Sequence, residues 1–136
     1  MSARSKARKR ALDLLFQADV RGAPAADVLA AEAARAAAEP AREASWLYAR
    51  EIVDGVIAHR AEIDDQIRTH ARDWKLERMP AVDRSVLRIG VWELLHNRDV
   101  PAAVAIDEAV DLAKQYSTEE SGAFVHGILA RIARAD

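Results

Sequence analysis

The sequence contains no cysteine, which excludes disulfide bonds, thiolate zinc sites and thiol nucleophiles. Glycine and proline are scarce, with five and four residues among 136, so few positions interrupt regular structure. The abundant alanine, leucine, glutamate and arginine, with few β-branched runs, favour helices throughout. We therefore expect an all-α protein from a reducing compartment, the cytoplasm.

Long hydrophobic runs are also missing. No stretch reaches the roughly 18 apolar residues that a transmembrane helix needs, and the basic N-terminus is followed by alternating leucine and aspartate rather than by an apolar core. The sequence thus predicts neither a membrane protein nor a signal peptide. With 136 residues and 51% hydrophobic content, residues 1–136 are expected to fold as one domain with its own core.

Motifs for catalysis and for nucleotide or metal binding are absent. No GxxxxGK[ST], GxGxxG or GxSxG pattern occurs, and the adjacent acidic pairs Asp64–Asp65 and Glu119–Glu120 would diverge on a helix. The four histidines lack the usual spacing of zinc ligands: His59, His70, His96 and His126. We therefore predict a protein that is not an enzyme and that holds no metal and no cofactor.

The sequence does contain a strong charge asymmetry. Five of its first ten residues are basic and none is acidic: Arg4, Lys6, Arg8, Lys9 and Arg10. Residues 11–136 hold the other 15 basic side chains and all 22 acidic ones, a formal charge of −7. Clustered lysine and arginine bind phosphate backbones through counterion release, whatever the net charge of the protein. The cluster predicts a nucleic acid partner, while a merely solvated helix start and an acidic membrane surface remain as alternatives.

An amphipathic helix over residues 4–20 begins inside this basic cluster. Its apolar stripe consists of Ala7, Ala11, Leu14, Leu15 and Ala18. Phe16 projects roughly 140° away from Ala11, on the side shared by Lys9 and Asp13. There the ring could stack on an unpaired base, or another helix could cover it.

Five further helices are expected. They cover residues 25–38, closed by Glu39–Pro40; residues 42–72; and stretches that begin at Pro80, at Pro101 and at a capping-box pattern, Ser117 to Glu120. Gly55 inside the second of them indicates close contact with another helix. The helix from Pro80 is apolar around most of its circumference, so it is either the centre of the core or a face shared with a partner protein.

Three segments of the chain resemble the NusB family. They are residues 79–95 (MPAVDRSVLRIGVWELL), residues 100–114 (VPAAVAIDEAVDLAK) and residues 124–129 (FVHGIL). The resemblance spans nearly the whole chain, and the stretch IDEAVDLAK, in register with the other two segments, makes it specific. Members of this family are bacterial transcription antitermination factors. The resemblance implies an all-helical fold of about six to seven helices in two small bundles.

The resemblance also implies partners and binding residues. It implies single-stranded boxA RNA of nascent, chiefly ribosomal, transcripts, together with NusE, a small-subunit ribosomal protein, in an antitermination complex with RNA polymerase. The implied RNA-binding residues are Arg4, Lys6, Arg8, Lys9, Arg10, Phe16, Lys114, Tyr116, Glu120 and Phe124. The implied contacts to NusE are Asp83, Arg84 and Arg88. Many members have tyrosine and aspartate where this chain has Phe16 and Glu120; phenylalanine keeps the stacking surface and loses the hydroxyl.

Two other classes of function stay open. The chain could be a protein-interaction scaffold, or a homodimer whose interface covers the basic helix and masks the RNA site. A NusB-like domain also precedes the catalytic domain of certain RNA cytosine methyltransferases. This sequence has neither a cofactor-binding domain nor a cysteine nucleophile, so we expect RNA binding without catalysis.

Overall fold

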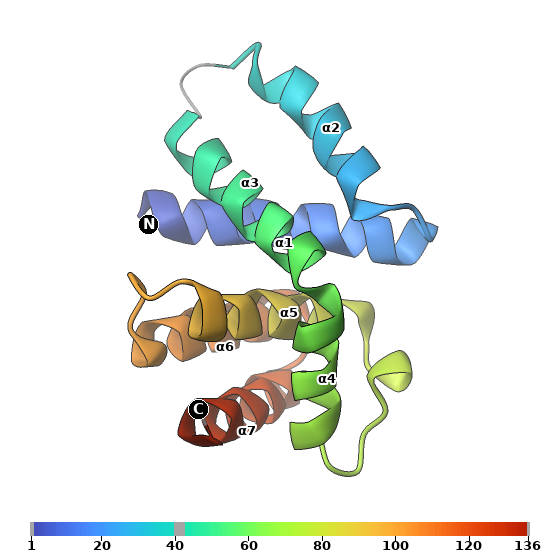
Figure 1. Ribbon diagram of the computed structural model, residues 1–136, viewed down its shortest axis with the longest axis vertical. Helices are drawn as coiled ribbons and strands as arrows, with labels where there is room; N and C mark the ends of the chain where they lie inside the picture. The colour runs from blue at the N-terminus through green and yellow to red at the C-terminus, as the bar shows by residue number, and fades with distance from the viewer. Residues whose placement is uncertain (1, 40–42, 136) are drawn as a thin grey trace.

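The computed structural model describes residues 2–39 and 43–135 (Figure 1). These residues form seven α-helices and one short 3-10 helix, with no strand among them. The elements are α1 (Ala3–Arg21), α2 (Ala25–Ala36), α3 (Glu43–Ala58), α4 (Arg60–His70), η2 (Leu76–Arg78), α5 (Ala81–His96), α6 (Ala102–Tyr116) and α7 (Glu119–Ala135). None of these described helices has the length and apolar character to cross a membrane. The all-α prediction is confirmed.

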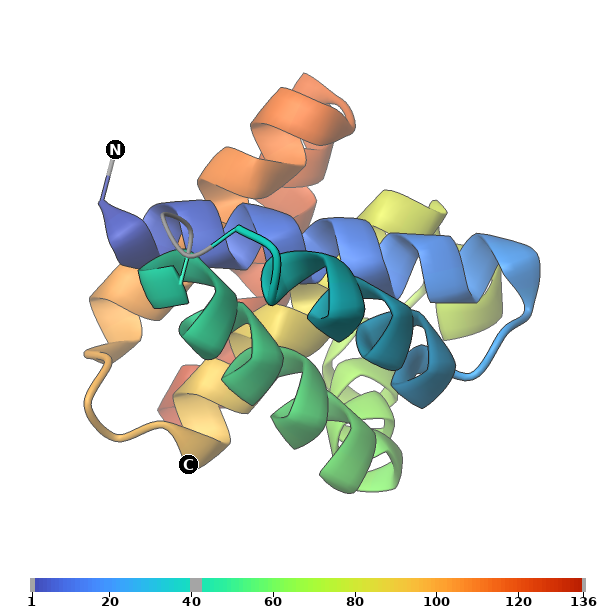
Figure 2. The same ribbon diagram turned by 90° about the horizontal axis from the view of Figure 1, so that it is seen from above.

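The helices are arranged in two groups, one above the other in Figure 1. Helices α1 to α3 form the upper group and α4 to α7 the lower one, and α1 extends along nearly the full width of the molecule (Figure 2). Helix α5 packs against α1 and α3 of the upper group and against α4, α6 and α7 of its own. The two small bundles expected from the family resemblance are therefore present.

Helix α1 follows the predicted amphipathic pattern. The Ser2 hydroxyl accepts a hydrogen bond from the Ser5 backbone N–H and caps its first turn. Gly22, with φ at +66°, ends the helix in the left-handed conformation that suits glycine. All five residues of the predicted apolar stripe are buried: Ala7, Ala11, Leu14, Leu15 and Ala18. Phe16, off that stripe, is 37% exposed, so no other helix of the described chain covers it fully.

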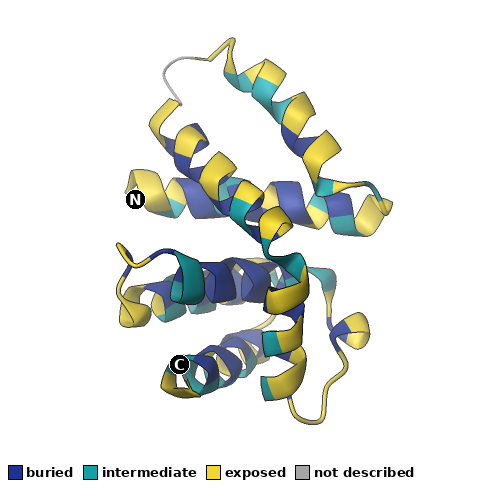
Figure 3. Ribbon diagram, viewed as in Figure 1, coloured by how far each residue is buried: buried dark blue, intermediate teal, exposed yellow. Residues whose placement is uncertain are grey.

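Helix α5 is the centre of the core. Every residue from Ser85 to Glu93 is buried, and the helix is dark blue along most of its length in Figure 3. A helix that is apolar on all sides must be covered on all sides, and the neighbouring helices of this chain provide that cover. Of the two interpretations of its pattern, the structure therefore favours the central core helix over a face left for a partner.

Gly55 of α3 marks the contact between α3 and α5. A Cβ atom at this position would overlap the indole nitrogen of Trp92 on α5, which is itself buried. The close helix contact predicted at this glycine is confirmed. It brings the upper group of helices directly onto the central helix.

The single helix predicted over residues 42–72 is wrong. The chain leaves the helical conformation at His59 (φ −116°, ψ 22°), which separates α3 from α4. Both helices contact α5, but α3 also packs on α1 and α2, whereas α4 also packs on α7, so the two halves belong to different groups. Residue 42, the predicted start of that helix, and Pro40, predicted to close the preceding helix, lie outside the described residues.

The capping box predicted at Ser117 and Glu120 is also wrong. Thr118 is the cap, because its Oγ1 accepts a hydrogen bond from the Ser121 backbone N–H at 3.0 Å. Ser117 instead shares a hydrogen bond of 3.0 Å with the Ser121 hydroxyl. The one-residue difference leaves the Glu120 side chain exposed at the start of α7.

Candidate nucleic-acid interface

Arg8, one of the five cations predicted to bind RNA, is buried in the core. It donates hydrogen bonds from Nε and Nη2 to the two carboxylate oxygens of Glu93 on α5, at 2.9 and 3.0 Å. The Tyr48 hydroxyl donates to the same carboxylate, and Asn97 Nδ2 donates to the Tyr48 oxygen at 2.9 Å. A guanidinium so enclosed joins α1 to α5 and does not face solvent. The prediction that Arg8 contacts RNA does not fit this position.

Burial and the Glu93 charge act together on this cluster. Burial raises the pKa of Tyr48, and the hydrogen bond and negative charge of Glu93 raise it further. Burial alone would lower the pKa of Arg8, but the hydrogen bond and charge of Glu93 outweigh it, and the pKa is raised. Near neutral pH the phenol therefore stays protonated and the guanidinium stays charged.

We expect this cluster to make the fold sensitive to alkali. Because folding raises the pKa of Tyr48, its contribution to stability is complete below about pH 10, the ordinary tyrosine value, and is lost as pH rises through the higher folded-state value. In a Tyr116→Phe variant, Tyr48 is the only tyrosine. Its tyrosinate absorption should then appear only as helical circular dichroism is lost. Ionisation near pH 10 in a fully helical protein would contradict this expectation.

Arg10 is also turned toward its own chain. Its guanidinium donates a hydrogen bond of 3.1 Å to the Ser45 hydroxyl and lies 3.3 Å from the Glu32 carboxylate. Its Cζ atom is 5.5 Å from the centre of the Trp46 ring. Arg10 thus joins α1 to both α2 and α3 within the upper group, as Arg8 joins α1 to α5.

The other three cations of the cluster reach the surface. Arg4 and Lys6 are exposed, and Lys9 is half-buried. The Lys9 ammonium pairs with Asp13 one turn along α1 at 2.6 Å and lies 4.7 Å from the centre of the Tyr116 ring, at the end of α6. This cation–π contact places the last turn of α6 beside the basic start of α1.

A groove of about 320 Å³ lies between these two helices and is called here the α1–α6 groove. Its lining includes Ser5, Lys9, Glu108, Lys114 and Tyr116. Tyr116 is 42% exposed, whereas Glu108 accepts a 2.7 Å hydrogen bond from Ser5 and lies 3.4 Å from Arg8. The fold therefore brings three of the predicted RNA-binding residues, from two distant segments, into one groove. Phe16 lies farther along α1, two helical turns beyond Lys9 on the same face.

Glu120 and Phe124 line a different hollow. With Trp74, Met79 and Asp83 they surround a mainly apolar cavity of about 360 Å³, called here the aromatic pocket. The Trp74 and Phe124 rings meet edge to face with their centres 5.8 Å apart, and Trp74 is 55% exposed. Trp74 was not predicted as a site residue, because it lies in an irregular link where helical periodicity carries no information.

Asp83, predicted to contact a partner protein, lines the aromatic pocket from α5. Its side chain is buried, and Oδ2 accepts a 3.0 Å hydrogen bond from the Ser121 hydroxyl. Its Oδ1 has no hydrogen-bond partner among the described residues. A buried acceptor without a partner costs about 1–3 kcal/mol, so a donor group entering the pocket would be stabilised there.

Arg84 and Arg88, the other two predicted partner contacts, are held by their own chain. Arg84 donates to Asp19 of α1 at 2.9 Å and to the Met79 carbonyl at 2.8 Å. Arg88 is buried and donates to Asp64 of α4 at 2.9 Å. Because these bonds join α1, α4 and α5, the two guanidinium groups support the fold, which does not fit the prediction that they contact a partner.

Comparisons with known proteins agree over nearly the full chain. Residues 5–134 match the model of the NusB family. The transcription antitermination protein NusB of Leifsonia xyli subsp. xyli is 68% identical over 134 residues, which cover 98% of this chain and 93% of that protein. The protein of the same name from Clavibacter michiganensis subsp. michiganensis is 62% identical over 133 residues, covering 98% and 97% of the two chains.

Solved structures show the same fold. NusB of T. maritima has a TM-score of 0.82 and 36% identity, covering 98% of this chain and 92% of that one. A NusB chain from a crystal structure of antitermination factors NusB and NusE with double-stranded RNA has a TM-score of 0.82 and 32% identity. That match covers 100% of this chain and 99% of the other.

Proposed function

This chain belongs to the NusB family of transcription antitermination proteins, and from that premise we propose that it binds the boxA element of nascent, chiefly ribosomal, RNA together with NusE. The pair would promote assembly of the antitermination complex on RNA polymerase. This is a binding role without catalysis, exerted in the cytoplasm where bacterial transcripts are made. The observation that carries the RNA part of the proposal is the α1–α6 groove, where Lys9, Lys114 and Tyr116 meet.

In the proposed complex, cations hold phosphates and aromatic rings hold bases. Arg4 and Lys6 at the exposed start of α1 would contact the RNA backbone, and Lys9 and Lys114 would do so in the groove. Exposed rings stack on unpaired bases, at about 1–3 kcal/mol for each base. Tyr116 supplies such a ring, and Phe16 supplies a second on the same face of α1. A-form duplexes turn their bases inward, so we propose single-stranded RNA as the ligand.

We propose the aromatic pocket as the docking place for NusE. A solved structural relative is described in a complex with NusE, which supports this partner. Aromatic side chains and desolvated pockets are typical of the energetic centre of a protein interface. The exposed Trp74, the half-buried Phe124 and the buried Asp83 lie together in this pocket. The proposed contact thus moves from Arg84 and Arg88 to the pocket. Because Glu120 and Phe124 also line it, the RNA and NusE would meet there.

The test is fluorescence anisotropy with labelled RNA at fixed salt, with and without purified NusE. The ligands are a single-stranded boxA RNA, a scrambled RNA of the same length and a boxA duplex. We expect preference for the boxA strand, and a larger preference when NusE is present. Equal or absent binding to all three RNAs with NusE present would instead favour a protein-only scaffold or a homodimer that masks the groove.

A variant with alanine at both Arg4 and Lys6 serves as the matched probe of the phosphate contacts. Each lost contact to single-stranded RNA lowers the slope of log affinity against log salt by about 0.7, so the double variant should lose roughly 1.4. Alanine at Arg35 and Arg50, exposed cations on α2 and α3, should leave the slope unchanged. Equal slopes for the two double variants would remove the start of α1 from the interface.

A further inference from the structure

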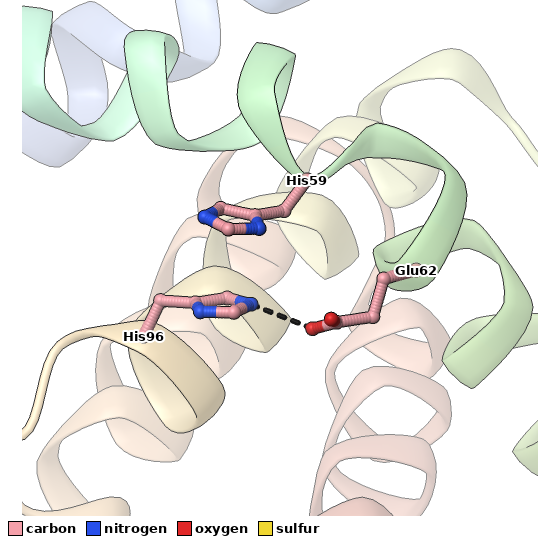
Figure 4. Close-up of side chains that lie close together, drawn as sticks. All are labelled: His59, Glu62 and His96. Atoms are coloured by element: carbon pink, nitrogen blue, oxygen red, sulfur yellow. Dashed lines mark hydrogen bonds and ion pairs between the residues drawn. The ribbon is translucent and has the colours of Figure 1, made fainter.

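Two histidines and a glutamate meet where α3, α4 and α5 adjoin. His59 lies at the break between α3 and α4, Glu62 lies in the first turn of α4, and His96 is the last residue of α5 (Figure 4). One nitrogen from each ring and one carboxylate oxygen all lie within 4.8 Å of one another. We propose that these three side chains form a binding site for a divalent transition-metal ion, with Zn²⁺ as the foremost candidate.

The donor atoms of the three side chains already lie close together. The two imidazole rings are stacked, with centres 3.7 Å apart and planes 12° apart, and His96 Nε2 lies 2.6 Å from Glu62 Oε1. Each ring has a nitrogen on the side that faces Glu62 (Figure 4). Zinc bound tetrahedrally at about 2.0–2.2 Å needs donors roughly 3.4 Å from one another. Side-chain rotations of the half-exposed histidines and the exposed glutamate would be needed to close the remaining difference.

The donor set selects the class of ion. Imidazole nitrogens suit Zn²⁺, Ni²⁺ and Cu²⁺, whereas Mg²⁺ and Ca²⁺ prefer oxygen ligands throughout. Two histidines and one carboxylate leave a fourth position of a tetrahedral ion for water. A hollow of about 480 Å³, lined among others by Glu62, Gln66, His70 and His96, adjoins the donors and provides room for that water.

A metal ion at this place would fasten the break between α3 and α4 to the end of the central helix. No metal site was predicted from the sequence, because the histidines lack the spacing along the chain that zinc ligands usually have. His59 and His96 belong to separate helical segments, and only the fold brings their rings together. The proposal replaces that expectation and does not depend on RNA or NusE binding.

The test is calorimetric titration of the full chain, without a histidine tag and after chelator treatment, with ZnCl₂ and separately with MgCl₂. We expect one Zn²⁺ per chain, a melting temperature that rises with Zn²⁺ concentration, and no response to Mg²⁺. His96→Gln and Glu62→Gln should each weaken Zn²⁺ binding at least about ten-fold. Mutating a residue that only hydrogen-bonds a metal ligand typically costs about 10–100-fold in affinity, so losing a ligand itself should cost at least as much. His126→Gln, which alters an exposed histidine on α7, should bind as the wild type.

A third variant, His59→Gln, keeps the test decisive together with Glu62→Gln if His96→Gln disturbs the end of α5. His59→Gln and Glu62→Gln alter half-exposed or exposed positions, and circular dichroism would show that each remains helical. Wild-type protein that takes up no stoichiometric Zn²⁺ would overturn the proposal. So would binding that neither variant weakens, because the ion would then lie elsewhere and His96 and Glu62 would form only a hydrogen-bonded pair.

Discussion

Glu93→Ala should lower the free energy of unfolding by about 3–5 kcal/mol, the cost of leaving a buried charge without its partner. Glu93 is buried in α5 and accepts hydrogen bonds from Arg8 and from the Tyr48 hydroxyl. Alanine would remove both interactions and leave the buried Arg8 guanidinium with only the partly exposed Glu108 carboxylate, 3.4 Å away, as its counter-charge. Such a loss should lower the melting temperature by about 10–20 °C, measured by circular dichroism and checked by urea unfolding.

Glu108→Ala is the matched control for this change. Glu108 also lies near Arg8, at 3.4 Å, but its side chain is 28% exposed, so its loss should cost less than about 1 kcal/mol. The double variant Arg8→Met and Glu93→Leu should recover part of the stability, because it removes the charge and its partner together. Equal costs for the two glutamate variants would show that the buried Glu93 carboxylate is not the main anchor of Arg8.

Hydrophobic periodicity predicted the parts of the fold that one helix determines by itself. The buried stripe of α1 and the central position of α5 both follow from which faces of a helix are apolar. The break at His59 does not follow from periodicity, because apolar spacing continues from Val56 to Ile63 and Ile67 across it. Beyond α5, which both contact, α3 packs on α1 and α2 and α4 packs on α7. Such distant packing partners cannot be read from a local sequence pattern.

The charge composition identified the basic end of α1, but it could not tell which of its five cations face solvent and which are buried. Arg8 follows Ala7 directly and precedes Ala11 by three residues, so helical spacing already places it beside the apolar stripe. What the sequence did not reveal was Glu93, the distant carboxylate that makes its burial possible. A basic residue next to a buried stripe should therefore be examined for a structural role before it is assigned to RNA.

The same reasoning applies to Arg88 in α5. A charged residue inside a helix that is buried on all sides needs a partner within the fold, and Asp64 provides it. The family resemblance implied partner contacts at Asp83, Arg84 and Arg88 alike, and it could not separate Asp83, which lines a pocket, from the two arginines, which are held by their own chain. Neither helical periodicity nor the family resemblance could identify Trp74, because it lies outside the helices and outside the segments that resemble the family.

Tyr116→Ala should weaken the binding of single-stranded boxA RNA by about five-fold to 150-fold, the equivalent of losing one stacked base at about 1–3 kcal/mol. The ring is 42% exposed in the α1–α6 groove, with the Lys9 ammonium 4.7 Å from its centre. A base stacked on the free part of the ring would lie beside a cation that can hold its phosphate. Anisotropy titrations at several salt concentrations measure the effect, and circular dichroism shows whether the helices persist.

Two controls separate stacking from other roles of Tyr116. Tyr116→Phe keeps the ring and should lose less than about ten-fold, the upper range for one neutral hydrogen bond, while Leu47→Ala trims an exposed apolar residue on α3 and should change nothing. If Tyr116→Ala lowers affinity with an unchanged salt slope, the ring itself binds the base. If the slope falls as well, the ring also positions Lys9 for a phosphate. Wild-type affinity in Tyr116→Ala would exclude the α1–α6 groove as the place where bases stack.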